Sequence, residues 1–78
     1  MEAGIVRADL HGKTKYQAKV TVDALLRRAG AGTYRILLIH GCHGGTALRD
    51  FLLETYAAHP RVKRLRLAPD GGTTELIL

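Results

Sequence analysis

The fold is decided by residues 34–40, which read YRILLIH and contain the longest apolar run of the chain. Residues 36–39 are apolar without alternation, which is typical of a strand that is buried on both faces or lies at the centre of a sheet. The glycine-rich segment 41–45 follows directly, and Thr46 after it is a preferred residue type for the N-terminal cap of a helix. This stretch therefore predicts a central strand, a loop and the start of a helix.

The N-terminal side of this stretch predicts a strand and a helix. Residues 5–10 alternate between apolar and polar, as in a strand with one buried face. Thr14 and Gln17 have the spacing of a capping box, so a helix should begin there and end at the glycines of residues 30–32. Its predicted buried stripe is Ala18, Val22, Leu25 and Ala29.

The C-terminal side predicts one helix and two strands. The helix that starts at Thr46 should end at His59-Pro60, because the residue before proline disfavours helical geometry. Residues 61–68 alternate and predict a strand, residues 69–72 a turn, and residues 73–78 a last strand. The predicted buried stripe of this helix is Leu48, Phe51, Leu52, Thr55 and Tyr56.

The order strand–helix–strand–helix–strand–strand predicts a two-layer α/β (α+β) sandwich. The strand–helix–strand connections place both helices on one face of a mixed four-stranded sheet. The last two strands should be antiparallel, because a tight turn joins them. A chain of 78 residues is expected to form one domain, spanning residues 1–78.

Composition and charge exclude several classes of protein. No apolar run approaches the roughly 18 residues of a membrane span, and the N-terminus lacks the pattern of a secretory signal. The single cysteine, Cys42, excludes an internal disulfide and suits the reducing cytoplasm. The net charge of +5 favours an anionic partner, of which nucleic acid is the commonest, although surplus charge also serves solubility alone.

Chemically useful residues follow two of the predicted strands. Asp9 and His11 stand at the end of the first, and His40 opens the glycine-rich loop after the second. Ligands bind beyond the carboxyl ends of parallel strands, so these residues should meet at one edge of the sheet. The free N–H groups of the second helix would attract an anion there. The expected phosphate contacts are Gly41, His43, Gly44, Gly45, Thr46 and Arg49.

Two segments resemble the motifs of the small MutS-related (Smr) domain family. Residues 8–12 (ADLHG) resemble the family's LDLHG motif, and residues 39–49 (IHGCHGGTALR) resemble its HGxGxGxLR motif. With His59-Pro60 and residues 72–76, the resemblance covers residues 6–78. It implies a two-layer fold similar to the C-terminal domain of bacterial translation initiation factor three. It also implies nucleic-acid binding, with endonuclease activity on DNA or RNA in many members.

The resemblance assigns roles to the residues that match the motifs. His11 is expected to act as a general base or to donate to phosphate, and Asp9 to orient it or bind a metal. The alternative is that both residues only fix the turn. His40 is either a third catalytic residue or a histidine that ties two strand ends together.

Departures from the family pattern leave two alternatives, a domain that cleaves nucleic acid and one that only binds it. Ala8 stands where the family usually has leucine, and the loop is one residue longer. Cys42-His43 replaces the Lys-Gly of many active members, and His43 substitutes for a lysine only while it is protonated. The domain is thus expected to bind nucleic acid, DNA or RNA, as an endonuclease or as a non-catalytic module.

Other interpretations also stay open. Residues 40–43 with Asp9 and His11 would supply metal ligands, but a glycine-rich loop is a poor scaffold for a rigid site, so no cofactor is expected. Arg64 and Arg66 either track a nucleic-acid backbone or protect an edge strand from aggregation. A small-anion or nucleotide-binding protein, or a metal-assisted hydrolase, is the remaining alternative. We expect a monomer or weak homodimer with no membrane partner.

Overall fold

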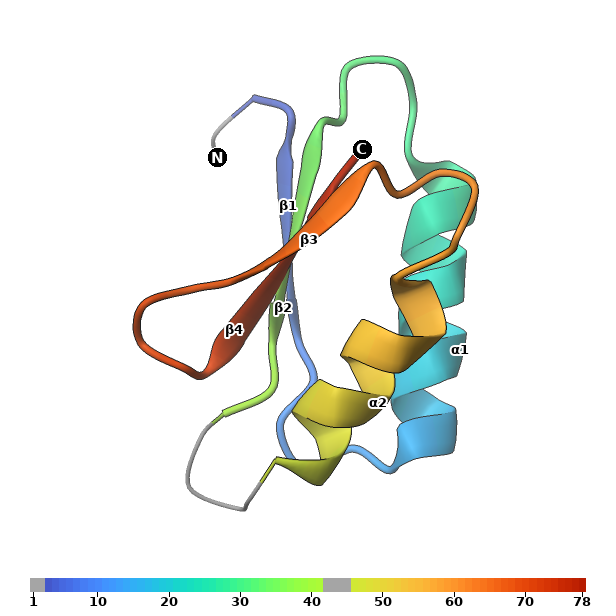
Figure 1. Cartoon of the computed structure of the whole chain (residues 1–78). Helices are drawn as coiled ribbons and strands as arrows, with labels where there is room; N and C mark the ends of the chain where they lie inside the picture. The colour runs from blue at the N-terminus through green and yellow to red at the C-terminus, as the bar shows by residue number, and fades with distance from the viewer. Residues whose placement is uncertain (1–2, 42–45) are drawn as a thin grey trace.

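The strands and helices follow one another along the chain in the predicted order (Figure 1). The computed structural model describes residues 3–41 and 46–78. Both helices pack on one face of a four-stranded sheet, so the predicted two-layer α+β architecture is confirmed. The elements are β1 (Ile5–Asp9), α1 (Lys15–Arg28), β2 (Arg35–Ile39), α2 (Ala47–Tyr56), β3 (Arg64–Leu67) and β4 (Thr73–Ile77).

The central position predicted for the apolar strand is also confirmed. The strand order is β1-β2-β4-β3, with β1 and β2 parallel and β4 antiparallel to both of its neighbours. β2 buries Ile36 and Leu38 under the helices and leaves Leu37 and Ile39 half-buried on the opposite face. Both faces of the strand therefore carry apolar residues, which explains the run without alternation.

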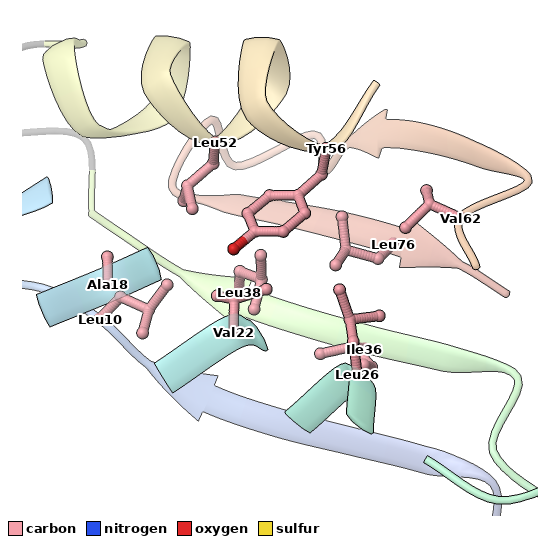
Figure 2. Close-up of a cluster of buried hydrophobic side chains, with 10 residues drawn as sticks. All are labelled: Leu10, Ala18, Val22, Leu26, Ile36, Leu38, Leu52, Tyr56, Val62 and Leu76. Carbon is pink, nitrogen blue, oxygen red and sulfur yellow. The ribbon is translucent and has the colours of Figure 1, made fainter. Parts of the chain in front are cut away.

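One apolar cluster between the helices and the sheet forms the core (Figure 2). Side chains from α1 and α2 point toward side chains from β2 and β4. Burial of this apolar surface is the main favourable contribution to folding. Its members are Leu10, Ala18, Val22, Leu26, Ile36, Leu38, Leu52, Tyr56, Val62 and Leu76.

The predicted stripe of α1 is right in its first half and wrong in its second. Ala18 and Val22 are fully buried, but the third buried residue is Leu26, and Leu25 is only partly buried. The stripe continues at four-residue spacing because residues i and i+4 share one face of a helix. Ala29 does not extend the stripe, since it caps the C-terminus of the helix.

The predicted ends of α1 agree with the structure. Gln17 N–H donates to Thr14 Oγ1 at 3.1 Å, and Thr14 N–H donates to Gln17 Oε1 at 2.9 Å, which completes the capping box. At the other end, the guanidinium of Arg61 donates to the carbonyl oxygens of Leu26 and Ala29, both at 2.6 Å. A cation at the C-terminus of a helix also interacts favourably with the helix dipole.

β3 is shorter than the predicted strand over residues 61–68. It spans Arg64–Leu67, and Val62 enters the core from the connection that precedes it. β3 is an edge strand, since within the described residues it pairs with β4 alone. Leu67 remains 44% exposed there.

A hydrogen bond between the helices places a carboxylate at the boundary of the core. Tyr56 Oη donates to Asp23 Oδ1 at 2.7 Å, and Lys19 Nζ donates to Asp23 Oδ2 at 2.6 Å. Burial raises the pKa of Asp23, but the hydrogen bonds from Lys19 and Tyr56 outweigh burial and leave its pKa below the ordinary value.

Tyr56→Phe is expected to destabilise the domain by about 1.5–3 kcal/mol at neutral pH, the range for a hydrogen bond to a charged group. Because the folded-state pKa of Asp23 is lowered, its stabilisation is complete above the unfolded-state pKa of about 3.9 and is lost as the pH falls through the folded-state value. The difference in Tm between wild type and variant should therefore shrink below about pH 4. Thermal unfolding followed by circular dichroism checks this, and a pH-independent difference would contradict it.

Candidate nucleic-acid interface

The carboxyl ends of β1 and β2 and the first turns of both helices lie at one end of the molecule (lower end of Figure 1). Asp9 is paired with Ile39 across the parallel ladder, and Leu10 N–H donates to the Ile39 carbonyl oxygen at 2.7 Å. Just beyond the strands, a Cβ added to Gly41 would lie 3.9 Å from the Cβ of His11. The structure thus brings the two motif segments side by side.

Asp9 holds the imidazole ring of His11 in one orientation. His11 Nδ1 lies 2.6 Å from Asp9 Oδ1, and the backbone N–H of His11 donates to the same oxygen at 3.1 Å. These hydrogen bonds, above all the one to the ring, lower the pKa of Asp9, so the carboxylate is ionised at neutral pH. An ionised carboxylate accepts, which places the proton of the neutral ring on Nδ1.

The pair is open to solvent, with side-chain exposures of 72% for His11 and 58% for Asp9. In the described part of the chain, no residue hydrogen-bonds to Nε2 of His11. Nε2 is therefore the nitrogen that an incoming group can reach, and in the neutral ring it is the basic one. This arrangement gives His11 the geometry of a general base and Asp9 that of its orienting carboxylate.

His40 directly follows β2 and is only 8% exposed. Its Nδ1 is 2.9 Å from the carbonyl oxygen of Gly41, which can only accept, so Nδ1 carries a proton. Its Nε2 is 2.8 Å from the hydroxyl of Thr74, which is fully buried in β4. Since both ring nitrogens have protein partners, the geometry favours His40 as the tie between two strand ends.

A groove of about 410 Å³ opens between the β1–α1 turn and the first turn of α2. His40 and Leu48 form part of its wall, together with Lys13 and Lys15. The two lysines were not expected in the site, although their position directly after the Asp9–His11 motif was a usable signal. Two ammonium groups beside a groove favour an anionic ligand.

Asp50 is hydrogen-bonded to both of the described residues at the start of α2 that were expected to contact phosphate, Thr46 and Arg49. Arg49 donates from Nε and Nη2 to Asp50 Oδ1 at 3.2 and 3.1 Å, and Thr46 Oγ1 donates to Asp50 Oδ2 at 3.0 Å. Thr46 occupies the predicted N-cap position, but its side chain makes no capping hydrogen bond. Its φ of −113° and ψ of 3° are not the extended geometry that a capping hydroxyl requires.

The remaining predicted contacts fall in two places. His43, Gly44 and Gly45 lie outside the described residues, as does Cys42. Arg64 and Arg66 lie on β3, at the opposite edge of the sheet from β1. Within residues 3–41 and 46–78, no group of three or more His, Cys, Asp or Glu side chains is placed to hold a metal ion.

A second groove, of about 470 Å³, lies between α1 and the segment after α2. It is larger, and two of its three lysine and arginine side chains have protein partners. Lys19 pairs with Asp23, and Arg61 binds the last carbonyl oxygens of α1, which leaves Arg27 as the third. Its lining includes the carboxylate of Asp23, whereas the groove beside His40 has no carboxylate among its described lining residues.

Comparisons with known proteins agree with this geometry. The Smr domain family matches residues 8–75, a range that includes both motifs. The crystal structure of the Smr domain of Thermus thermophilus MutS2 is similar, with a TM-score of 0.83 and 35% sequence identity over 94% of this chain and 96% of that chain. No curated protein gives a significant match. The chain belongs to the Smr domain family.

Proposed function

We propose that this domain binds nucleic acid at the end of the sheet formed by β1 and β2, and that it cleaves the bound strand. Smr domains are known generally for nucleic-acid binding or nuclease activity. The proposal is supported above all by Asp9 and His11, which form an exposed pair 2.6 Å apart with Nε2 of His11 open to a substrate.

RNA offers this pair a reaction that needs no other nucleophile. Nε2 of His11 takes the proton of the 2′-hydroxyl, and the 2′-oxygen attacks the adjacent phosphorus. The bond to the 5′-oxygen of the next nucleotide breaks, that oxygen takes up a proton, and a 2′,3′-cyclic phosphate remains. Proton transfer by a positioned side chain contributes on the order of 10²- to 10⁴-fold in rate. On DNA the same nitrogen would have to activate a water molecule.

The proposed phosphate contacts surround the pair. Lys13 and Lys15 line the groove, and the backbone of Gly41 lies beside His11. Arg49 and Thr46 join them when Asp50 releases their side chains. The predictions for His43, Gly44 and Gly45 remain part of this proposal, and His40 acts in it as a positioning residue.

A non-catalytic binding module is the second candidate. It is favoured by Asp50, which holds Thr46 and Arg49 in the free protein, and by Cys42-His43 in place of a lysine. Incubation of the purified protein with labelled RNA and DNA, with and without EDTA, separates the two candidates. We expect RNA fragments ending in a cyclic phosphate. Salt-dependent binding without cleavage in any buffer would support the binding module, and neither binding nor cleavage would contradict both candidates.

Asp50→Asn is expected to tighten oligonucleotide binding by roughly 3- to 10-fold. Removal of one negative charge near a bound phosphate is worth about 1 kcal/mol at the surface, and the change also replaces the charge-assisted hydrogen bonds from Thr46 and Arg49 with weaker neutral ones. Glu54→Gln, one helical turn further along α2, removes the same charge and serves as the matched control. Fluorescence anisotropy titrations measure both variants. Asp50→Asn binding no tighter than that of Glu54→Gln would show that Asp50 does not compete with phosphate.

Location, assembly and domain extent are proposals that rest on the sequence. A cytoplasmic location fits the single Cys42. Residues 1–78 are proposed as one domain, monomeric or weakly dimeric, since β1 and β3 are edge strands. In the ranges that the structure describes, neither helix has the length and apolar character needed to cross a bilayer.

A further inference from the structure

The face of the sheet that the helices leave uncovered carries a cluster of arginines. Successive side chains of a strand point to opposite faces. Because Ile36, Leu38 and Leu76 point toward the helices (Figure 2), the residues between them point to the open face. Cross-strand pairing arranges that face in three rows, with Ile5, Arg35, Ile77 and Arg64 in the first, Arg7, Leu37, Glu75 and Arg66 in the second, and Asp9, Ile39 and Thr73 in the third. We refer to Arg7, Arg35, Arg64 and Arg66 as the open-face arginines.

One buried carboxylate organises the middle of this cluster. Arg35 Nη1 lies 3.3 Å from Glu75 Oε1, and Arg66 Nε lies 3.5 Å from Glu75 Oε2. Glu75 is only 8% exposed, so its charge is largely covered, whereas the side chain of Arg66 is 58% exposed. Two carboxylates, Glu75 and Asp9, among four guanidinium groups leave an excess of positive charge on the face, which suits a polyanion.

Apolar surface lies between the positive charges. Leu37, Ile39 and Ile77 are half-buried on the open face. Four strands at a spacing of about 4.8 Å make this surface roughly 14 Å wide. Unpaired nucleic acid offers both phosphates for the arginines and base surfaces for the aliphatic side chains, whereas a duplex keeps its bases stacked inside. The combination therefore favours a single strand.

The open face that carries these arginines also carries Asp9 of the candidate site. Asp9 follows Arg7 by two residues on the same face of β1, about 7 Å further along the strand. His11 is hydrogen-bonded to Asp9. We infer that the helix-free face of the sheet binds single-stranded nucleic acid and guides it to the Asp9–His11 pair. This inference deepens the proposed function and rests on it.

The test compares two double variants that lose the same charge. Arg7→Gln/Arg64→Gln alters the two edges of the open face, and Arg27→Gln/Arg28→Gln alters exposed residues of the last turn of α1. The probe is a 2′-O-methyl RNA of about 12 nucleotides, which lacks the reactive hydroxyl, used as a single strand and as a duplex. Titrations at several salt concentrations give the affinity and its salt slope, and circular dichroism verifies folding.

The open-face variant is expected to bind the single strand about tenfold more weakly than wild type. Loss of two phosphate contacts should reduce the salt slope by about 1.4, and the control variant should retain most of both quantities. Equal weakening by both variants, or tighter binding of the duplex by the wild type, would overturn the inference. If the open-face double variant does not fold, the single variants Arg64→Gln and Arg28→Gln are compared in its place. The expected reduction in salt slope is then about half as large, because one phosphate contact is lost and not two.

The result also separates this inference from the proposed function. If the wild type binds neither single strand nor duplex, the proposed function and the inference both fail. If the wild type binds and cleaves RNA while the open-face variant behaves like its control, the inference alone fails.

Discussion

Asp9→Asn and His11→Ala should each lower the rate of RNA cleavage by about 10²- to 10⁴-fold, the range that general acid–base catalysis supplies. His11→Ala removes the base. Asp9→Asn leaves an amide whose NH₂ group can donate to Nδ1, which would shift the ring proton to Nε2 and remove the basic nitrogen from the exposed side. Both side chains are exposed, so the Tm should change little.

Single-turnover cleavage with saturating enzyme measures this effect on the chemical step. Glu54→Gln is the matched control, since it removes one exposed carboxylate from α2. The affinity of both site variants for a 2′-O-methyl oligonucleotide should stay within a few-fold of wild type. Cleavage that survives in either variant would remove that residue from the proposed chemistry.

Leu38→Ala should lower the free energy of unfolding by about 2–5 kcal/mol, the cost of removing a large side chain from a packed core. Leu38 is fully buried on the helix-facing side of β2, the strand that lies between β1 and β4 (Figure 2). A domain of this size has a total stability of roughly 5–15 kcal/mol, so much of it would be lost.

Leu37→Ala on the same strand provides the comparison. Leu37 is half-buried and faces away from the helices, so less apolar surface is lost and the cost should be about 1 kcal/mol. Urea denaturation of both variants measures the difference. Equal losses would contradict a core that lies on one side of the sheet only.

The overall fold could be predicted because each element carries a local signal. Alternation in residues 5–10, the capping box at Thr14 and the unbroken apolar run of residues 36–39 are all properties of neighbouring residues. The details that failed depend on tertiary packing. Leu25 and Leu26 are equally apolar, and only the position of α1 against the sheet selects Leu26.

The part of the candidate site that strand topology alone brings together could be predicted from the sequence. Parallel pairing of β1 and β2 suffices to place Asp9 and His11 beside Gly41. The engagement of Arg49 by Asp50 depends on side-chain conformations, which residue spacing does not specify. The hydrogen bond of His40 to Thr74 could not be predicted from the sequence either, because Thr74 is 34 residues away in β4.

The grouping of the open-face arginines on one surface likewise depends on strand order, which residue spacing does not specify. Arg64 and Arg66 were recognised as a basic strand, but Arg7 and Arg35 were not linked to them. The four share one surface because β4 inserts between β2 and β3 and carries Glu75 to the middle of the face. No local sequence pattern predicts that β4 lies between β2 and β3.

A titration of the ¹⁵N-labelled domain with single-stranded 2′-O-methyl RNA, followed by NMR, tests most directly whether nucleic acid binds at this end of the sheet. Amide resonances of residues 7–15 and of Gly41 should shift first and together, with those of Arg49 and Asp50. Shifts confined to the groove of Lys19, Arg27 and Arg61, with residues 7–15 unchanged, would place the nucleic acid elsewhere and contradict the proposed interface.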